Sequence, residues 1–124
     1  MSDGDGRGQR IEEMGGQLRI LGEKFLLRTR EQSNQLRQLL TEVAAGHTGA
    51  LAQLEEIAHK IHGSGSMFGF TAISDCGGAL ERLAESLAAP TAGSADATAN
   101  PAALAQLTAL LGQLEAAVEQ ALTR

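Results

Sequence analysis

The sequence contains few cysteine, proline or aromatic residues, and each of these shortages argues against one or more classes of protein. A single cysteine, Cys76, permits no internal disulfide, which fits a reducing compartment. Three phenylalanines, with no tryptophan or tyrosine, leave little for stacking on nucleic-acid bases. Two prolines, in a composition rich in Ala, Leu, Gln and Glu, favour an all-α fold.

The chain also lacks a concentration of positive charge and a long apolar run. Its formal net charge is −5 and its ten Lys and Arg residues are scattered, so we expect no nucleic-acid partner. No segment approaches the roughly 18 consecutive apolar residues of a membrane span. The first ten residues, MSDGDGRGQR, contain no apolar run of the kind found in a signal peptide. We therefore expect a cytoplasmic protein with no membrane contact.

At 124 residues, the chain is long enough for one domain with a hydrophobic core. Residues 1–9 are polar and rich in glycine, and they are predicted to form a disordered tail before a domain over residues 10–124. A short accessory helix is predicted to begin near Gln9, and Gly15 and Gly16 are predicted to break or bend it.

Apolar periodicity and helix start and stop signals predict four longer helices. Their expected ranges are about 17–45, 49–67, 74–88 and 101 onward, with a loose loop over 90–100. Gly46 is the expected stop of the first helix and Thr48 the expected cap of the second, whereas Asn100 and Pro101 are expected to begin the last. We therefore predict an all-α antiparallel four-helix bundle with a short N-terminal accessory helix. The apolar stripe of its first long helix is predicted to contain Leu18, Leu21, Phe25, Leu36, Leu39, Leu40 and Val43.

The stretch 58–70, AHKIHGSGSMFGF, places two histidines three residues apart and just before a run of glycine and serine. At about 100° per residue, five residues share a polar arc beside the apolar face of this helix: Glu55, His59, His62, Gly63 and Ser66. A neutral surface imidazole is a nucleophile, and a donor one turn away can hold phosphoryl oxygens. Gly63 costs the helix about 1 kcal/mol relative to alanine. Access for a partner surface is the favoured reason for it, and close helix packing is the alternative.

This stretch resembles the signature of the histidine phosphotransfer (HPt) domain, roughly H-x-[LI]-K-G-[SA]-[SA] followed by a later glycine. The matching positions, in order, are His59 as the phosphoryl acceptor, Ile61, Gly63, Ser64, Gly65 and Gly69. The resemblance implies a four-helix bundle whose histidine is exposed on the second helix. His62 stands where the family usually has lysine, and it is the candidate donor to phosphoryl oxygens. Glu81, on the next helix, is the candidate for orienting the other imidazole nitrogen.

The resemblance implies a histidine-containing phosphotransfer protein. His59 would accept a phosphoryl group from a sensor or hybrid histidine kinase, or from a receiver aspartate, and pass it to the receiver domain of a response regulator. Because the chain has no Gly-rich nucleotide loop, we expect a phosphoryl carrier rather than an ATP-dependent kinase. We expect no cofactor on this chain, since the Mg²⁺ of aspartyl chemistry would belong to the receiver. We also expect a monomer that docks its partners through Glu55, Gly63 and Ser66.

Other interpretations stay open. A protein with the same fold that binds and sequesters a receiver or kinase domain without being phosphorylated would not depend on His59. A metal site would need ligands beyond the two histidines, with Glu55 and Cys76 as recruits, so no metal is expected. A hydrolytic role for His59 lacks a suitably placed nucleophile. Glu81 and Ser66 are also compatible with ordinary solvated side chains.

Overall fold

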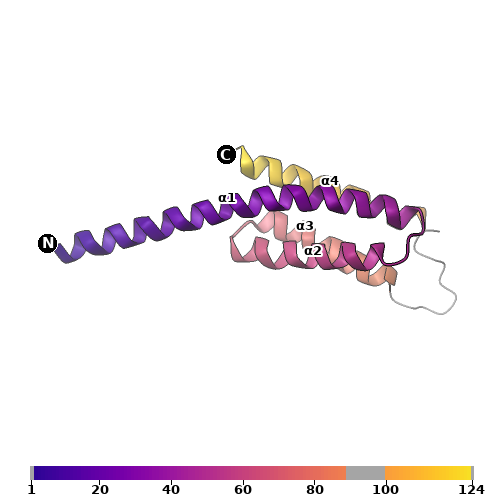
Figure 1. The fold of residues 1–124 in the computed structure, drawn as a ribbon, viewed down its shortest axis with the longest axis horizontal. Helices are drawn as coiled ribbons and strands as arrows, with labels where there is room; N and C mark the ends of the chain where they lie inside the picture. Colours follow the sequence, from indigo (N-terminus) through magenta and orange to yellow (C-terminus); the bar gives the residue numbers. More distant parts are fainter. Residues whose placement is uncertain (1, 89–99, 124) are drawn as a thin grey trace.

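The computed structural model describes residues 2–88 and 100–123, with side chains from residue 15 onward. Four helices make up these residues: α1 (Ser2–Ala44), α2 (Ala50–Met67), α3 (Thr71–Ala88) and α4 (Pro101–Leu122). Each helix packs against the next one along the chain, and α4 packs against α1, so the bundle closes on itself (Figure 1). The all-α helical bundle predicted from the sequence is confirmed.

The N-terminal part of α1 differs from the prediction. The backbone is helical without a break from Ser2, including residues 2–9, for which a disordered tail was predicted. The predicted accessory helix near Gln9 is therefore part of α1, and Gly15 and Gly16 do not interrupt it. A glycine lowers helix stability by about 1 kcal/mol relative to alanine, which weakens a helix without ending it. In Figure 1 this part of α1 extends past the ends of the other helices.

Glycines with positive φ end α1 and α2. Gly46 has φ 84° and Gly69 has φ 80°, values that L-residues with a side chain rarely adopt. After α2, the Phe70 amide donates to the Gly65 carbonyl at 2.8 Å and the Gly69 amide to the Ser66 carbonyl at 3.1 Å. This pair of bonds is a Schellman motif, and the same pattern follows α1. The stop predicted at Gly46 is confirmed.

The helix starts agree with the predictions in one case and differ in two. At α4, Asn100 Oδ1 accepts a hydrogen bond from the Ala103 amide at 3.1 Å, and Pro101 is the first helical residue, as predicted. At α2, Gly49 rather than Thr48 occupies the N-cap position and makes no side-chain cap bond. Helix α3 begins at Thr71, three residues earlier than predicted. The loop predicted over 90–100 lies outside the described residues except for Asn100.

The core is filled by aliphatic side chains from all four helices. The largest fully buried ones are Leu36, Leu54, Ile61, Ile73, Leu80, Leu107, Leu111, Leu114 and Val118. Thr29 and Ser33 continue the buried stripe of α1, and their hydroxyls donate to α1 carbonyl oxygens at 2.8 and 2.7 Å, which makes their burial tolerable. Leu18 and Leu21, which were predicted to join this stripe, are 58% and 48% exposed. They lie where α1 leaves the bundle.

Two bidentate ion pairs join α1 to α4 on the outside of the bundle. Arg30 donates to both carboxylate oxygens of Glu119, at 2.8 and 2.9 Å, and Arg37 pairs in the same way with Glu115. The hydrogen bond from Arg30 lowers the pKa of Glu119. These pairs engage two of the arginines in the most basic part of the sequence. Among the described helices, none has an apolar stretch long enough to cross a bilayer.

Candidate functional site

His59 lies in the middle of α2 and points away from the core. Its side chain is 72% exposed, whereas the neighbouring Ala58 and Ile61 are buried on the opposite side of the helix. Its Nδ1 contacts Oε2 of Glu81, on α3. Because a carboxylate oxygen accepts hydrogen bonds, the proton of this contact belongs to Nδ1. The neutral ring therefore keeps an unprotonated Nε2.

Glu81 was a candidate chosen without any motif to support it, and the structure places it next to His59. Its side chain is only 16% exposed, so most of the side chain is shielded from water. The same two residues line an open pocket together with Glu55 and Glu85. Glu55, which was predicted to contact a partner, lies one turn before His59 on this acidic side of the site. A negatively charged group on His59 would be repelled from that side.

His62 lies differently from the prediction. The sequence placed it on an exposed polar arc beside His59, but its ring is partly buried against α3. Its Nδ1 donates to the carbonyl oxygen of Ser74 at 2.8 Å, and the Ser74 hydroxyl donates to the His62 carbonyl at 2.8 Å. The sequence does not reveal this pairing, because the two residues belong to different helices.

Glycines allow α2 and α3 to lie close together near the site. A Cβ atom on Gly65 would lie 3.0 Å from the Ser74 amide nitrogen, and one on Gly77 would lie 2.9 Å from the His62 amide nitrogen. A Cβ on Gly78 would lie 2.9 Å from His62 Nδ1 and 3.2 Å from an Arg82 guanidinium nitrogen. The pair Gly77-Gly78 was the sequence signal that could have indicated this close approach.

Gly63 has a different environment from these glycines. It is exposed, and a Cβ atom added to it would meet no atom within 4 Å. The packing explanation for this glycine therefore fails, and the explanation based on access to His59 is left. Ser66, also predicted to face a partner, is exposed one turn further along α2.

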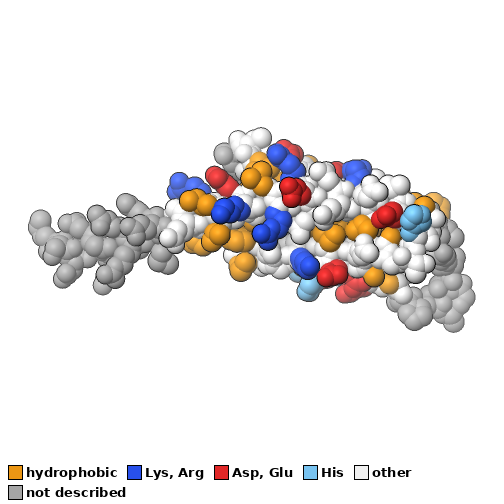
Figure 2. Space-filling model, in the orientation of Figure 1, with side chains coloured by type: hydrophobic (Ala, Val, Ile, Leu, Met, Phe, Trp, Pro, Cys, Tyr) orange, Lys and Arg blue, Asp and Glu red, His pale blue; other side chains and the backbone are white. Residues whose placement is uncertain are grey.

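A groove between α1 and α2 continues the surface that contains Gly63. Its lining combines apolar and basic side chains, among them Leu21, Met67, Lys24, Arg28 and Lys60. Figure 2 shows apolar and basic side chains gathered on the face where α1 leaves the bundle. We call these five residues the basic-apolar groove. Sequence reasoning missed it, because its members come from separate segments.

Arg82 is a further feature near the site that was not predicted from the sequence. It lies on the exposed side of α3, and its guanidinium approaches Gly78 next to the His62 ring. Lys60, the cation nearest to His59 in the sequence, pairs with Glu56 at 3.4 Å. Arg82 therefore adds positive charge to the side of the site away from Glu55 and Glu85.

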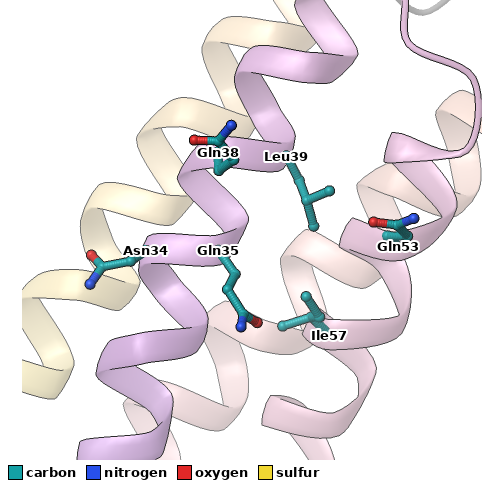
Figure 3. Close-up of a pocket in the computed structure, with 6 residues that line it drawn as sticks. All are labelled: Asn34, Gln35, Gln38, Leu39, Gln53 and Ile57. Atoms are coloured by element: carbon teal, nitrogen blue, oxygen red, sulfur yellow. The ribbon is translucent and has the colours of Figure 1, made fainter.

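A further groove between α1 and α2 is lined mainly by amide side chains. In Figure 3, Leu39 from α1 and Ile57 from α2 form its apolar floor, with Gln35, Gln38 and Gln53 around them. It contains no histidine or charged group among its lining residues, so it offers no nucleophile and no means of holding a phosphoryl group.

Cys76 lies on α3 and is partly buried. Burial, followed by the nearby charge of Asp75, raises the pKa of its thiol, which favours the less reactive protonated form. Within the described side chains, no three His, Cys, Asp or Glu residues are arranged to hold a metal ion.

The comparisons with known proteins agree with the sequence signature and the fold. A family model for the Hpt domain matches residues 21–120. This range begins within α1 and ends within α4, includes the whole of α2 and α3, and contains His59, Gly63 and Glu81. No curated protein and no solved structure matches the chain.

Proposed function

Because this chain belongs to the Hpt domain family, we propose that His59 is its phosphoryl-accepting residue, through Nε2. The observation that supports the proposal is the exposure and the hydrogen bonding of the His59 imidazole. Its side chain is 72% exposed, its Nδ1 is engaged by Glu81, and its Nε2 is left as the nucleophilic nitrogen. The general role, histidine phosphotransfer in a phosphorelay, follows from the family.

The proposed step is a displacement at phosphorus. The Nε2 lone pair attacks the phosphorus of a receiver's aspartyl phosphate, or of a phosphohistidine on a sensor or hybrid kinase. A bond from phosphorus to Nε2 forms while the bond to the donor oxygen or nitrogen breaks. Because Nδ1 keeps its proton, the phosphorylated ring is cationic, and the Glu81 carboxylate offsets that charge. Attack by a response regulator's aspartate then regenerates His59, with the required Mg²⁺ held by the receiver.

The acidic side of the site gives the phosphoryl group a preferred position. Glu55 and Glu85 line the pocket beside His59 and repel the negative phosphoryl oxygens, whereas the Arg82 guanidinium lies near Gly78, on the side of His62. Repulsion from carboxylates also raises the free energy of the phosphorylated protein, which favours onward transfer over storage.

The basic-apolar groove and the open surface at Gly63 and Ser66 are the proposed docking site for a receiver domain. Leu21 and Met67 offer exposed apolar area, 48% and 74% accessible respectively. Lys24, Arg28 and Lys60 complement the acidic phosphoacceptor site of a receiver, although the chain as a whole has a net charge of −5.

A phosphotransfer assay tests the acceptor. A receiver domain from the same organism is phosphorylated with acetyl phosphate and mixed with wild-type protein, with His59→Gln, and with His47→Gln as a matched control. His47 is exposed in the turn between α1 and α2, outside the helix that carries His59. We expect acid-labile, base-stable label on wild type and His47→Gln, with none on His59→Gln. Nuclear magnetic resonance of the phosphorylated protein should place the label on Nε2.

Two other results would change the conclusion. Label that survives in His59→Gln would move the acceptor to another residue. Tight receiver binding without label on any variant would favour the non-phosphorylated adaptor. Gly63→Arg tests docking separately: its open position tolerates a side chain in the fold, so normal transfer by a folded Gly63→Arg protein would refute the docking surface.

A further inference from the structure

We propose that His62 is a positioning residue that holds α3 against α2, so that Glu81 meets His59. The proposal assigns the effect to the Nδ1–H of His62 and its contact with Ser74, and not to contact with the phosphoryl group. Its kinetic consequence rests on the proposed function. Its structural consequence concerns the contact between His59 and Glu81, which can be measured without any partner.

The contact between His62 and Ser74 is reciprocal. The ring donates from Nδ1 to the Ser74 carbonyl oxygen at 2.8 Å, and the Ser74 hydroxyl donates to the His62 carbonyl oxygen at 2.8 Å. The same hydroxyl oxygen lies 3.1 Å from Nδ1, so it shares the Nδ1 proton. Ser74 is 5% exposed, and bonds that replace water at a buried position are costly to lose.

The backbone of α3 is shaped to receive the His62 ring. A Cβ atom on Gly78 would lie 2.9 Å from Nδ1, closer than real Cβ atoms approach another atom, and 3.1 Å from Cε1, which is tighter than most Cβ contacts. Gly77 similarly allows α3 to lie directly against the His62 backbone. The His62 ring therefore packs against α3 where Gly77 and Gly78 leave room for it, and its Nδ1 is hydrogen-bonded there to Ser74.

The His62 contact and the His59 contact cross the same helix interface. His62 follows His59 by one turn on α2, and Glu81 follows Ser74 by two turns on the same face of α3. A shift or rotation of α3 that breaks the first contact therefore moves the Glu81 carboxylate away from Nδ1 of His59. Misplacement of a catalytic group by about 1 Å can cost on the order of 100-fold in rate.

Three substitutions separate positioning from direct phosphoryl contact. His62→Asn keeps an N–H donor near the place of Nδ1 but has nothing at the place of Nε2. His62→Gln puts its donor near the place of Nε2 instead, and His62→Ala has neither. Positioning predicts that His62→Asn resembles wild type while the other two are impaired. Direct contact with the phosphoryl group predicts that His62→Gln is the better substitute.

The first readout is the His59 tautomer, measured by ¹⁵N nuclear magnetic resonance on the isolated full-length protein. We expect the Nδ1–H form in wild type and His62→Asn, and a mixture of both neutral tautomers in His62→Ala. A wild-type tautomer in His62→Ala would overturn the proposal. Far-ultraviolet circular dichroism verifies that each variant is folded at the temperature used.

The second readout is the rate of transfer from a phosphorylated receiver. We expect about a tenfold loss for His62→Ala, recovery in His62→Asn, and no additional loss when His62→Ala is added to Glu81→Ala. Additive losses would mean that His62 acts independently of Glu81 and would overturn the proposal. If wild type accepts no phosphoryl group, the proposed function fails, while the tautomer experiment still decides the role of His62.

Discussion

The same glycine-to-alanine change should have opposite effects on stability at two positions of α2 that are two residues apart. Gly63 is exposed, and a methyl group there meets nothing within 4 Å. Gly65 is buried, and a methyl group there would lie 3.0 Å from the Ser74 nitrogen and 3.1 Å from its Cα. Gly63 is inside α2 and Gly65 is in its last turn, so the gain in helix propensity is about 1 kcal/mol at Gly63 and no larger at Gly65.

The two variants should therefore differ in stability mainly because a methyl group at position 65, unlike one at position 63, would overlap with α3. Gly63→Ala should keep the whole gain and stabilise the protein by about 1 kcal/mol. Gly65→Ala must push α3 outward, at a cost of about 1–3 kcal/mol that cancels or exceeds the gain. For a domain of this size, each kcal/mol changes the midpoint of thermal unfolding by about 4 °C. We expect Gly63→Ala to melt several degrees above wild type and Gly65→Ala at or below it.

Thermal and urea unfolding, followed by circular dichroism, measure both variants against wild type. A stabilised Gly65→Ala protein would show that α3 does not lie close to α2 at Ser74. A destabilised Gly63→Ala protein would show that Gly63 has a packing role after all. The first outcome would also weaken the positioning role inferred for His62, because both arguments use the same interface.

Three other predictions concern single side chains. Glu81→Gln should keep His59 in the Nδ1–H tautomer, because an amide oxygen still accepts a hydrogen bond from Nδ1. Glu81→Ala should lose this preference for the Nδ1–H tautomer and slow phosphoryl transfer about tenfold. Equal tautomer ratios in the two variants would contradict this prediction. The pKa of Glu119 is lowered by its pair with Arg30, so the pair stabilises the fold at pH values above the unfolded-state pKa of the carboxyl, and this stabilisation is lost as the pH falls through the folded-state pKa. Glu119→Gln should therefore make the free energy of unfolding less dependent on pH in the acid range. An unchanged pH dependence would contradict a stabilising role for the pair. The raised pKa of Cys76 predicts slow alkylation by iodoacetamide in the native protein at neutral pH, with fast alkylation in urea; equal rates would contradict it.

Features set by neighbouring residues were predictable from the sequence. Asn100 with Pro101, and Gly46 after α1, act through bonds within a few residues, so their patterns indicate the helix ends directly. The HPt-like signature around His59 is also local, and the family match supports it. Gly15 and Gly16 were misleading because a glycine lowers helix propensity without specifying a positive φ.

Features that depend on contacts between helices were harder to predict. Apolar periodicity gave Leu18 and Leu21 the same stripe as the buried residues of α1, but it does not indicate where the other helices end. The helical wheel put His62 on a polar arc, and it contains no information about Ser74 on the next helix. Glu81 was found only because the resemblance directed attention to the helix after His59.

The short connection between α2 and α3 has a consequence for the order of folding. Residues 68–70 join the two helices, so the pair that carries His59 and Glu81 closes with a small loss of chain entropy. The pairing of α1 with α4 joins residues 89 apart in the chain, as in the contact of Arg30 with Glu119. We therefore expect the α2–α3 hairpin to be structured in the folding transition state, with α4 docking later. The proposed phosphoryl-accepting site would then belong to the part of the chain that folds first and opens last.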